Sequence, residues 1–183
     1  MKAFIISGSR NPNGQTAKAA HAFMKGFTDA GGEAEIVFLP ALKIERCRQC
    51  EDSGWGICIS EGKCVIEDDF AKIAEKLWEA DIVALANPVY YADLSESLRA
   101  FLDRFRRVRW SKVSVGSGGM KPAVLMCVAG GGGGGAPECI ESMLRNIRAS
   151  GLEAIEKIPA RRQDLDEKAV ELYELGKKLA VKR

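Results

Sequence analysis

The sequence predicts an α/β protein built on one doubly wound parallel sheet, with helices covering both faces. Apolar runs without alternation, such as Ala3–Ile6 and the DIVALA run of residues 81–86, are typical of parallel strands buried on both faces. Such runs alternate with helical patterns five times, which is the order of a parallel sheet with crossover helices. The 183 residues, 46% of them hydrophobic, contain no internal repeat and no linker, so we expect a single domain over residues 1–183.

Each strand is expected where an apolar run meets a turn signal. Pro40 stops the second run, the Asn-Pro pair at 87–88 breaks the third, and glycines follow the first and the fourth. The strands are therefore expected at residues 2–7, 34–39, 81–86, 123–129 and 152–158.

The helices are expected between these strands, where apolar residues recur at helical spacing. The first is Ala-rich and ends at Gly31-Gly32, and the second begins after Asp68 and Asp69, which stand at its N-cap. A third is amphipathic over 95–108 and is followed by a Gly/Ser-rich connection at 111–119. The helices are expected at residues 17–30, from 70 to the next strand, 95–108, 137–150 and 165–181.

Three unusual loops each follow a strand, at residues 8–16, 87–91 and 130–135. Ligands of open α/β sheets bind beyond the carboxyl ends of the strands, at the point where the strand order reverses. Because parallel strands end at the same edge of the sheet, we expect the three loops to meet there and form a ligand site.

The first loop has the features of an anion site. Hydroxyl and amide side chains, with Arg10, precede a helix N-terminus, where free N–H groups and the helix dipole favour negative charge. A Walker A loop does not fit, because five residues separate Gly8 from Gly14 and Gln15 stands in place of the lysine; a G-x-G-x-x-G pattern is absent. The composition favours a terminal monophosphate over a triphosphate. The alternative is a strand–loop–helix joint with no ligand.

The same segments resemble a known family. GSRNPNGQT at 8–16 is similar to the GSPR-x-x-G-x-T phosphate loop of NADPH-dependent FMN reductases and of the related iron–sulfur flavoproteins, although Arg10 and Asn11 stand where that family often has Pro-Arg. NPVYY at 87–91 resembles the S-P-V-Y-W/Y segment that lies along the flavin ring, and residues 93–104 resemble the helix that follows it. The resemblance implies a three-layer, flavodoxin-like, five-stranded parallel sheet of order 2-1-3-4-5.

The resemblance also implies FMN as the cofactor and NAD(P)H as a co-substrate, with flavin, a quinone or another protein as acceptor. We expect backbone groups of Val89 and Tyr90 to be free to meet the polar edge of the ring. No catalytic acid or base is evident. The implied phosphate-binding residues are Ser9, Arg10, Asn11, Asn13, Gly14, Gln15 and Thr16, and the implied ring-binding residues are Pro88, Val89, Tyr90, Tyr91, Gly130, Gly131, Gly132 and Gly133.

Four cysteines gather in an insertion at about 44–66, with the spacing C-x2-C-x7-C-x5-C. The iron–sulfur flavoproteins carry C-x2-C-x2-C and a later fourth cysteine at this place, so the third cysteine here comes five residues late. A [4Fe–4S] cluster, a tetrahedral zinc ion, and free or redox-active thiols all remain open. The candidate metal ligands are Cys47, Cys50, Cys58 and Cys64, whereas Cys127 and Cys139 are expected in the core.

Charge and composition exclude other classes. A net charge of +2 is too mild to indicate nucleic acid. There is no apolar run of membrane-spanning length and no signal peptide, so we expect a cytoplasmic protein without a membrane partner. We interpret the arginines at 104–109 as a solvated helix end, and expect Asp103 and Arg104 to form a structural or subunit-interface ion pair.

The predicted function is an FMN-binding, NAD(P)H-dependent oxidoreductase, which the resemblance implies to be a homodimer or homotetramer. An alternative is an electron-transfer iron–sulfur flavoprotein without pyridine-nucleotide activity, with a cluster on the four clustered cysteines. A further alternative is a redox-sensing or scaffold protein that has lost its flavin.

Overall fold

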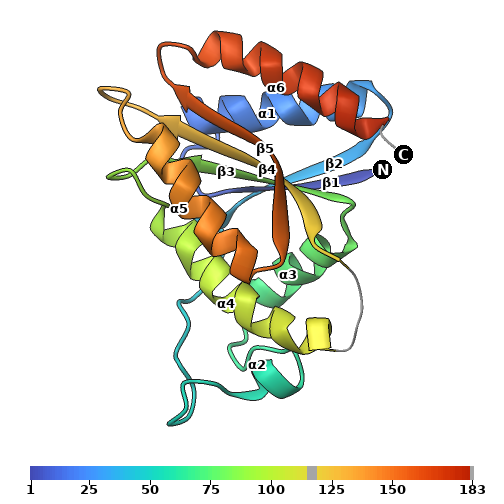
Figure 1. Cartoon of the computed structure of the whole chain (residues 1–183), viewed down its shortest axis with the longest axis vertical. Coiled ribbons are helices and arrows are strands. Elements are labelled where there is room, and N and C mark those ends of the chain that lie inside the picture. Colours follow the sequence, from blue (N-terminus) through green and yellow to red (C-terminus); the bar gives the residue numbers. More distant parts are fainter. Residues whose placement is uncertain (115–118, 182–183) are drawn as a thin grey trace.

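The computed structural model describes residues 1–114 and 119–181. Five strands form one parallel sheet of order β2-β1-β3-β4-β5 (Figure 1), which confirms the predicted flavodoxin-like topology. The strands are β1 (Lys2–Ser7), β2 (Glu33–Phe38), β3 (Ile82–Pro88), β4 (Lys121–Ala129) and β5 (Leu152–Arg161).

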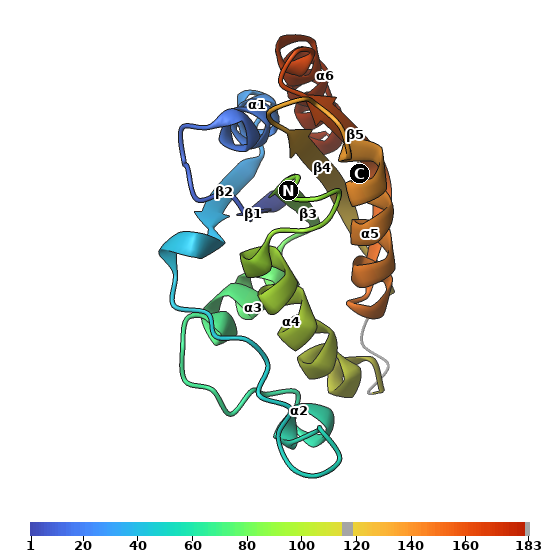
Figure 2. The same cartoon turned by 90° about the vertical axis from the view of Figure 1, so that its left-hand side faces the viewer.

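Helices cover both faces of the sheet, as Figures 1 and 2 show. α1 and α6 pack on one face, and α3, α4 and α5 pack on the other. The helices are α1 (Gln15–Asp29), the short 3-10 turn η1 (Leu39–Ala41), α2 (Ile57–Ser60), α3 (Phe70–Glu79), α4 (Glu96–Ser114), α5 (Ala136–Ala149) and α6 (Leu165–Ala180).

The three central strands β1, β3 and β4 are buried on both faces, as their continuous apolar runs predicted, whereas the edge strands β2 and β5 alternate buried or partly buried residues with exposed ones. Along β1, Phe4 and Ile6 pack toward α3 and α4, whereas Ala3 and Ile5 pack toward α1 and α6. Every residue of β3 is buried. Because alternate side chains enter two separate cores, each central strand must be apolar along the length that the helices cover.

Several element boundaries differ from the expectation; for example, β4 begins at Lys121 and α1 at Gln15, each two residues earlier than expected. β3 continues through Asn87 and Pro88, because Pro88 pairs with Val128 at the end of the strand. β5 continues to Arg161, and α4 continues to Ser114, into the stretch where a connection was expected. The rest of that connection, residues 115–118, lies outside the described residues. In the described ranges, no helix combines the length and apolar character needed to cross a bilayer.

The insertion at 44–66, hereafter the cysteine segment, leaves the sheet after η1 and returns at α3. Its middle part extends past the end of α4 at one pole of the molecule (Figures 1 and 2). α2 is the one helix within it, and it contacts α4.

Candidate functional site

The three unusual loops meet at the carboxyl edge of the sheet and line one cleft of about 690 Å³. This volume lies within the range of about 300–1,000 Å³ that is typical of small-molecule sites. The lining side chains include no Asp, Glu, Lys or Arg, so a bound anion would meet neutral donors. The cleft is lined by Ser9, Asn11, Asn13, Gly14, Gln15, Thr16, Pro88, Val89, Tyr90, Val128, Ala129 and Gly130–Gly134.

The first loop is held in shape by its own polar groups. The Ser9 hydroxyl accepts from the Asn11 N–H at 3.2 Å, and the Asn11 side-chain carbonyl accepts from the Asn13 N–H at 2.9 Å. These short-range bonds form a turn that leads directly into α1. The loop therefore presents its shape to the cleft without help from a ligand.

The N-terminus of α1 is left open toward the cleft. Gly14 occupies the N-cap, no side chain caps the helix, and the first turn carries no acidic residue. The first N–H groups of a helix have no partner within it, and the helix dipole places partial positive charge there. This end of the cleft is therefore suited to an anion.

The start of the first loop, at Gly8, has no room for a side chain. A Cβ on Gly8 would stand 2.2 Å from the Ser95 Oγ and 3.1 Å from the Asn87 Oδ1. The Gly8 N–H bonds to the carbonyl of Ala86, and the Ser97 hydroxyl donates to the Gly8 carbonyl at 3.3 Å. The close approach joins the first loop to the start of α4.

The second loop differs from one expectation. The N–H groups of Val89 and Tyr90 are not free, because they donate to the carbonyls of Val128 and Asp93 at 3.0 and 3.2 Å. The expectation that backbone groups of Val89 and Tyr90 are free to meet a ligand was therefore wrong for their N–H groups. They instead form the turn that carries Tyr90, which is half exposed, and Tyr91, which is fully exposed with a φ of +50°.

The third loop, residues 130–135 and hereafter the glycine loop, ends in a backbone conformation that favours glycine. Gly135 has a φ of +84°, and a Cβ there would stand 3.0 Å from the Ala92 backbone. The loop turns through a bond from the Gly133 N–H to the Gly130 carbonyl at 2.9 Å. A Cβ on Gly130, Gly131 or Gly132 would meet nothing within 4 Å, so this wall of the cleft is open backbone.

Asp93 fixes the second loop to the helices beneath it. Its carboxylate accepts from the Ser142 hydroxyl at 2.5 Å, from the Leu94 N–H at 2.7 Å and from Arg99 at 3.2 Å. The hydrogen bond from Ser142, followed by that from Leu94, lowers the pKa of Asp93. The loop is thus tied to both α4 and α5.

Among the implied ligands, Arg10 and Tyr91 are the two that do not line the cleft. Arg10 turns away and pairs with Glu96 at 2.9 Å, in an exposed ion pair. The remaining implied phosphate and ring residues all line the cleft. Three further lining residues were not predicted from the sequence, namely Val128, Ala129 and Gly134 at and beyond the end of β4; their signal was their position beside the glycine run.

Arg104 holds the cysteine segment at its neck. Its guanidinium forms bonds of 2.6 and 3.0 Å to Asp68 and donates to the carbonyl of Glu45 at 3.0 Å. Both charged side chains are about 1% exposed or less, and the Arg104 guanidinium lies 4.1 Å from the Phe70 ring centroid. Burial opposes the charge of Arg104, but bonds to Asp68 and Cys64 outweigh it and raise the pKa.

This arrangement corrects two expectations and confirms a third. Arg104 pairs with Asp68 and not with Asp103, whose partner is Arg106 at 3.6 Å. The N-cap expectation is confirmed, because Asp69 stands at the N-cap of α3 and the Asp68 side chain caps the N–H of Phe70 at 3.1 Å, while the Asp69 side chain accepts from the Lys43 N–H. The expectation of a solvated helix end is wrong for three of the four arginines, because the Nε atoms of Arg104, Arg107 and Arg109 are buried, whereas Arg106 is half exposed.

Arg107 anchors the tip of the segment. Its guanidinium lies 4.5 Å from the Trp55 ring centroid and donates to the Gly54 carbonyl at 2.6 Å. A cation over an aromatic face adds attraction beyond the hydrogen bond. Two arginines on successive turns of α4 therefore bind the neck and the tip of the cysteine segment.

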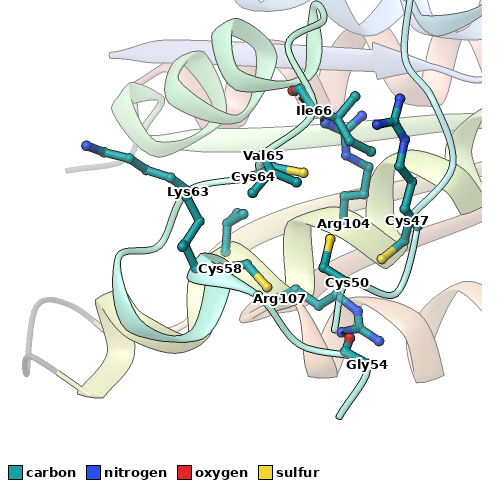
Figure 3. A pocket seen from close by; sticks show the side chains of 14 residues that line it. Cys47, Cys50, Gly54, Cys58, Lys63, Cys64, Val65, Ile66, Arg104 and Arg107 are labelled. Carbon is teal, nitrogen blue, oxygen red and sulfur yellow. Dashed lines mark hydrogen bonds between the residues drawn. The ribbon is translucent and has the colours of Figure 1, made fainter. Parts of the chain in front are cut away.

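The four clustered cysteines surround one cavity. Figure 3 shows Cys47, Cys50, Cys58 and Cys64 around it, with Arg104 and Arg107 entering from α4. All four thiols are free and partly buried. In residues 1–114 and 119–181, no three His, Cys, Asp or Glu side chains converge closely enough to hold a metal ion.

The donor set is nevertheless that of a thiolate-bound cluster or ion. Four thiols face a space that also receives two guanidinium groups, and the Nε atoms of Arg104 and Arg107 lack a hydrogen-bond partner among the described residues. Buried N–H donors of this kind stabilise negative sulfur. The residues present fit an anionic sulfur group in type, although their four sulfur atoms stand too far apart to share one ion.

Comparison with known proteins defines the family. Residues 1–156 match the model of the NADPH-dependent FMN reductase family. The chain belongs to that family. An iron–sulfur flavoprotein of Archaeoglobus fulgidus is 36% identical over 104 residues, which are 57% of this chain and 45% of that protein. One of Methanocaldococcus jannaschii is 35% identical over 109 residues, 60% of this chain and 54% of that protein.

The chain thus aligns with about half the length of these curated relatives. Among solved structures, the NAD(P)H:quinone oxidoreductase from Methanothermobacter marburgensis superposes with a TM-score of 0.70 at 17% identity, covering 100% of this chain and 98% of that one. This likeness supports the flavodoxin-like fold. The family match includes all three loops of the cleft.

Proposed function

We propose that this member of the FMN reductase family binds FMN in the cleft and transfers reducing equivalents from NAD(P)H to an acceptor such as flavin or a quinone. The observation that carries the proposal is the convergence of three strand-end loops on one cleft, with an uncapped helix N-terminus at one end and a bare glycine wall at the other. Bound FMN would supply the hydride chemistry.

The residues of the chain would position the cofactor. Backbone N–H groups at the start of α1, with the hydroxyls of Ser9 and Thr16, would hold the phosphate. Tyr90 and Pro88 would flank the ring on one side and the glycine loop on the other, where the absence of side chains lets the backbone approach a flat ligand. The cleft lining holds no Asp, Glu, His, Lys, Arg or Cys side chain, so the chain would act mainly by binding and orientation.

The assembly and location belong to the same proposal. We infer a homodimer or homotetramer in the cytoplasm, supported by the exposed Tyr90 and Tyr91 at the mouth of the cleft. Aromatic side chains of this kind are enriched in protein interfaces. Analytical ultracentrifugation of wild type and of Tyr91→Ser tests it: a monomer in both would contradict the inference.

The test of the main proposal is FMN binding followed by steady-state oxidation of NADH and NADPH with a quinone. Thr16→Val should weaken FMN binding by about ten- to a hundredfold, because a hydrogen bond to a charged group is lost. Thr28→Val, on the same helix, removes a hydroxyl that bonds only the helix backbone and should leave binding unchanged. A colourless protein that does not bind added FMN would contradict the proposal.

A second candidate function is electron transfer through a cluster on the cysteine segment, and the observation that favours it is the cavity shared by four thiols and two arginines. Cys47, Cys50, Cys58 and Cys64 would hold a [4Fe–4S] cluster, a one-electron carrier. Several relatives are named iron–sulfur flavoproteins. Iron and zinc analysis of protein purified without air decides: about four irons per chain supports it, one zinc points to a structural ion, and neither leaves free thiols.

A further inference from the structure

Two cysteines outside the cysteine segment lie together in the core. Cys127, near the end of β4, and Cys139, near the start of α5, are both fully buried, and their sulfur atoms are 3.1 Å apart. A disulfide bond is about 2.05 Å long, so a shift of roughly 1 Å would join them. The two residues flank the glycine loop of the cleft, within a few residues at either end.

The two thiols are chemically unequal. The Cys127 thiol donates to the Cys139 sulfur, which also receives the Asn87 side-chain N–H at 3.3 Å. The bond from Cys127, and then that from Asn87, lowers the pKa of Cys139, although burial opposes this. The bond to Cys139 and burial raise the pKa of Cys127. Cys139 is therefore the nucleophile of the pair, and Cys127 is placed to resolve what forms on it.

The pair is connected to the second loop of the cleft as well. The Cys139 thiol donates to the Asp93 carbonyl at 3.4 Å, and the Asn87 amide that bonds Cys139 also donates to the Pro88 carbonyl at 2.6 Å. A disulfide would remove the Cys139 S–H and with it the hydrogen bond to the Asp93 carbonyl. The oxidation state of the two sulfur atoms thus affects the hydrogen bonds that hold the turn carrying Tyr90.

We propose that Cys127 and Cys139 form a reversible dithiol–disulfide site, a second redox centre beside the cleft, with a small peroxide as the oxidant. Hydrogen peroxide would convert the Cys139 thiol to a sulfenic acid and release one water. The Cys127 thiol would then attack that sulfur, forming the S–S bond and releasing a second water. Two thiols and one peroxide thus give one disulfide and two waters, and an external dithiol returns both hydrogens.

The test is a mass measurement on the full chain, reduced, freed of reductant, treated with hydrogen peroxide in small excess, denatured and alkylated. No Lys or Arg stands between Cys127 and Cys139, so trypsin leaves both on one peptide. We expect that peptide to lose two hydrogens and both alkyl groups, and to regain both thiols with dithiothreitol. Full alkylation of both residues after peroxide would overturn the proposal.

Alanine variants test the assigned roles. With a sulfenic-acid trap, Cys127→Ala should retain the trap on Cys139, whereas Cys139→Ala should leave Cys127 unlabelled. Cys47→Ala is the matched control and should form the core disulfide as wild type does. Labelling of Cys127 in place of Cys139 would refute the assigned direction. The wild-type measurement stands if a variant does not fold, and it needs no flavin, so its failure is distinct from failure of the proposed function.

Discussion

The cleft and the cysteine segment both gather groups suited to a cofactor, but they are held in place by different means. The loops of the cleft are continuations of β1, β3 and β4, and short-range hydrogen bonds of backbone groups and of polar side chains within and beside the loops hold them in shape. The cysteine segment is a long excursion whose neck and tip depend on Arg104 and Arg107. A site built on strand ends inherits the rigidity of the sheet, whereas a site on an excursion depends on individual side chains.

Among variants that test this difference, Arg104→Leu should cause the largest loss of stability. Removing one partner of a buried ion pair leaves Asp68 uncompensated, which costs about 3–5 kcal/mol and lowers the melting temperature by about 10 °C in a chain of this size. Thermal and urea unfolding measure it. Arg106→Leu on the same helix breaks only a half-exposed pair and should cost less than about 1 kcal/mol.

A second variant separates the charge from the packing. Adding Asp68→Asn to Arg104→Leu removes the unpaired carboxylate and should restore part of the lost stability. A double variant no more stable than Arg104→Leu would mean that the cost lies in packing against Phe70, and not in the buried charge.

The next effect concerns the cleft, where a substitution should weaken FMN binding without destabilising the fold. Gln15→Glu places a negative charge in the first turn of α1, which holds no acid. FMN binding should weaken by about ten- to a hundredfold through repulsion of the phosphate, while the free chain gains about 0.3–1 kcal/mol from the helix dipole. Fluorescence titration with FMN and urea unfolding measure the two. Gln49→Glu carries the same charge change in the cysteine segment and should leave FMN affinity unchanged.

Arg107→Ala tests the tip of the cysteine segment. Losing the contacts with Trp55 and Gly54 should free the segment locally, at a cost of about 1–2 kcal/mol. Trypsin cleavage after Arg46, Arg48 and Lys63 should become about tenfold faster, with little change in global unfolding, because local opening governs proteolysis. Arg106→Ala is the matched control. Unchanged cleavage in Arg107→Ala would show that other contacts hold the tip.

The same difference explains what the sequence could predict. Apolar runs and strand-end loops predict the strands and the edge where the cleft lies, because burial and turn signals are local, whereas the strand order was implied by the family resemblance. The Arg104–Asp68 pair was not predicted, because it joins residues that are distant in sequence. One signal was available: Arg104 stands three residues after Phe101 and four before Val108, on the buried face of α4. The occupied N–H groups of Val89 and Tyr90 depended on where β4 lies, which a local pattern does not give.

The smallest expected effect is a pH dependence of the unfolding free energy that comes from Asp68, at the neck of the cysteine segment. Burial acts to raise the pKa of Asp68, but bonds from Arg104 and from the N–H groups of Glu45 and Phe70 outweigh it and lower the pKa below 3.8. As pH falls, the Asp68 carboxylate is therefore protonated earlier in the unfolded chain than in the folded chain. The stability that it contributes is present above the unfolded pKa and is lost as pH falls through the folded pKa. The unfolding free energies of wild type and Asp68→Asn, measured in urea, should differ most near neutral pH, and the difference should begin to shrink as pH falls below about 4. A difference that stays constant between pH 6 and pH 3 would mean that the carboxylate charge contributes nothing, and that the neck is held by shape and neutral hydrogen bonds, as the cleft is.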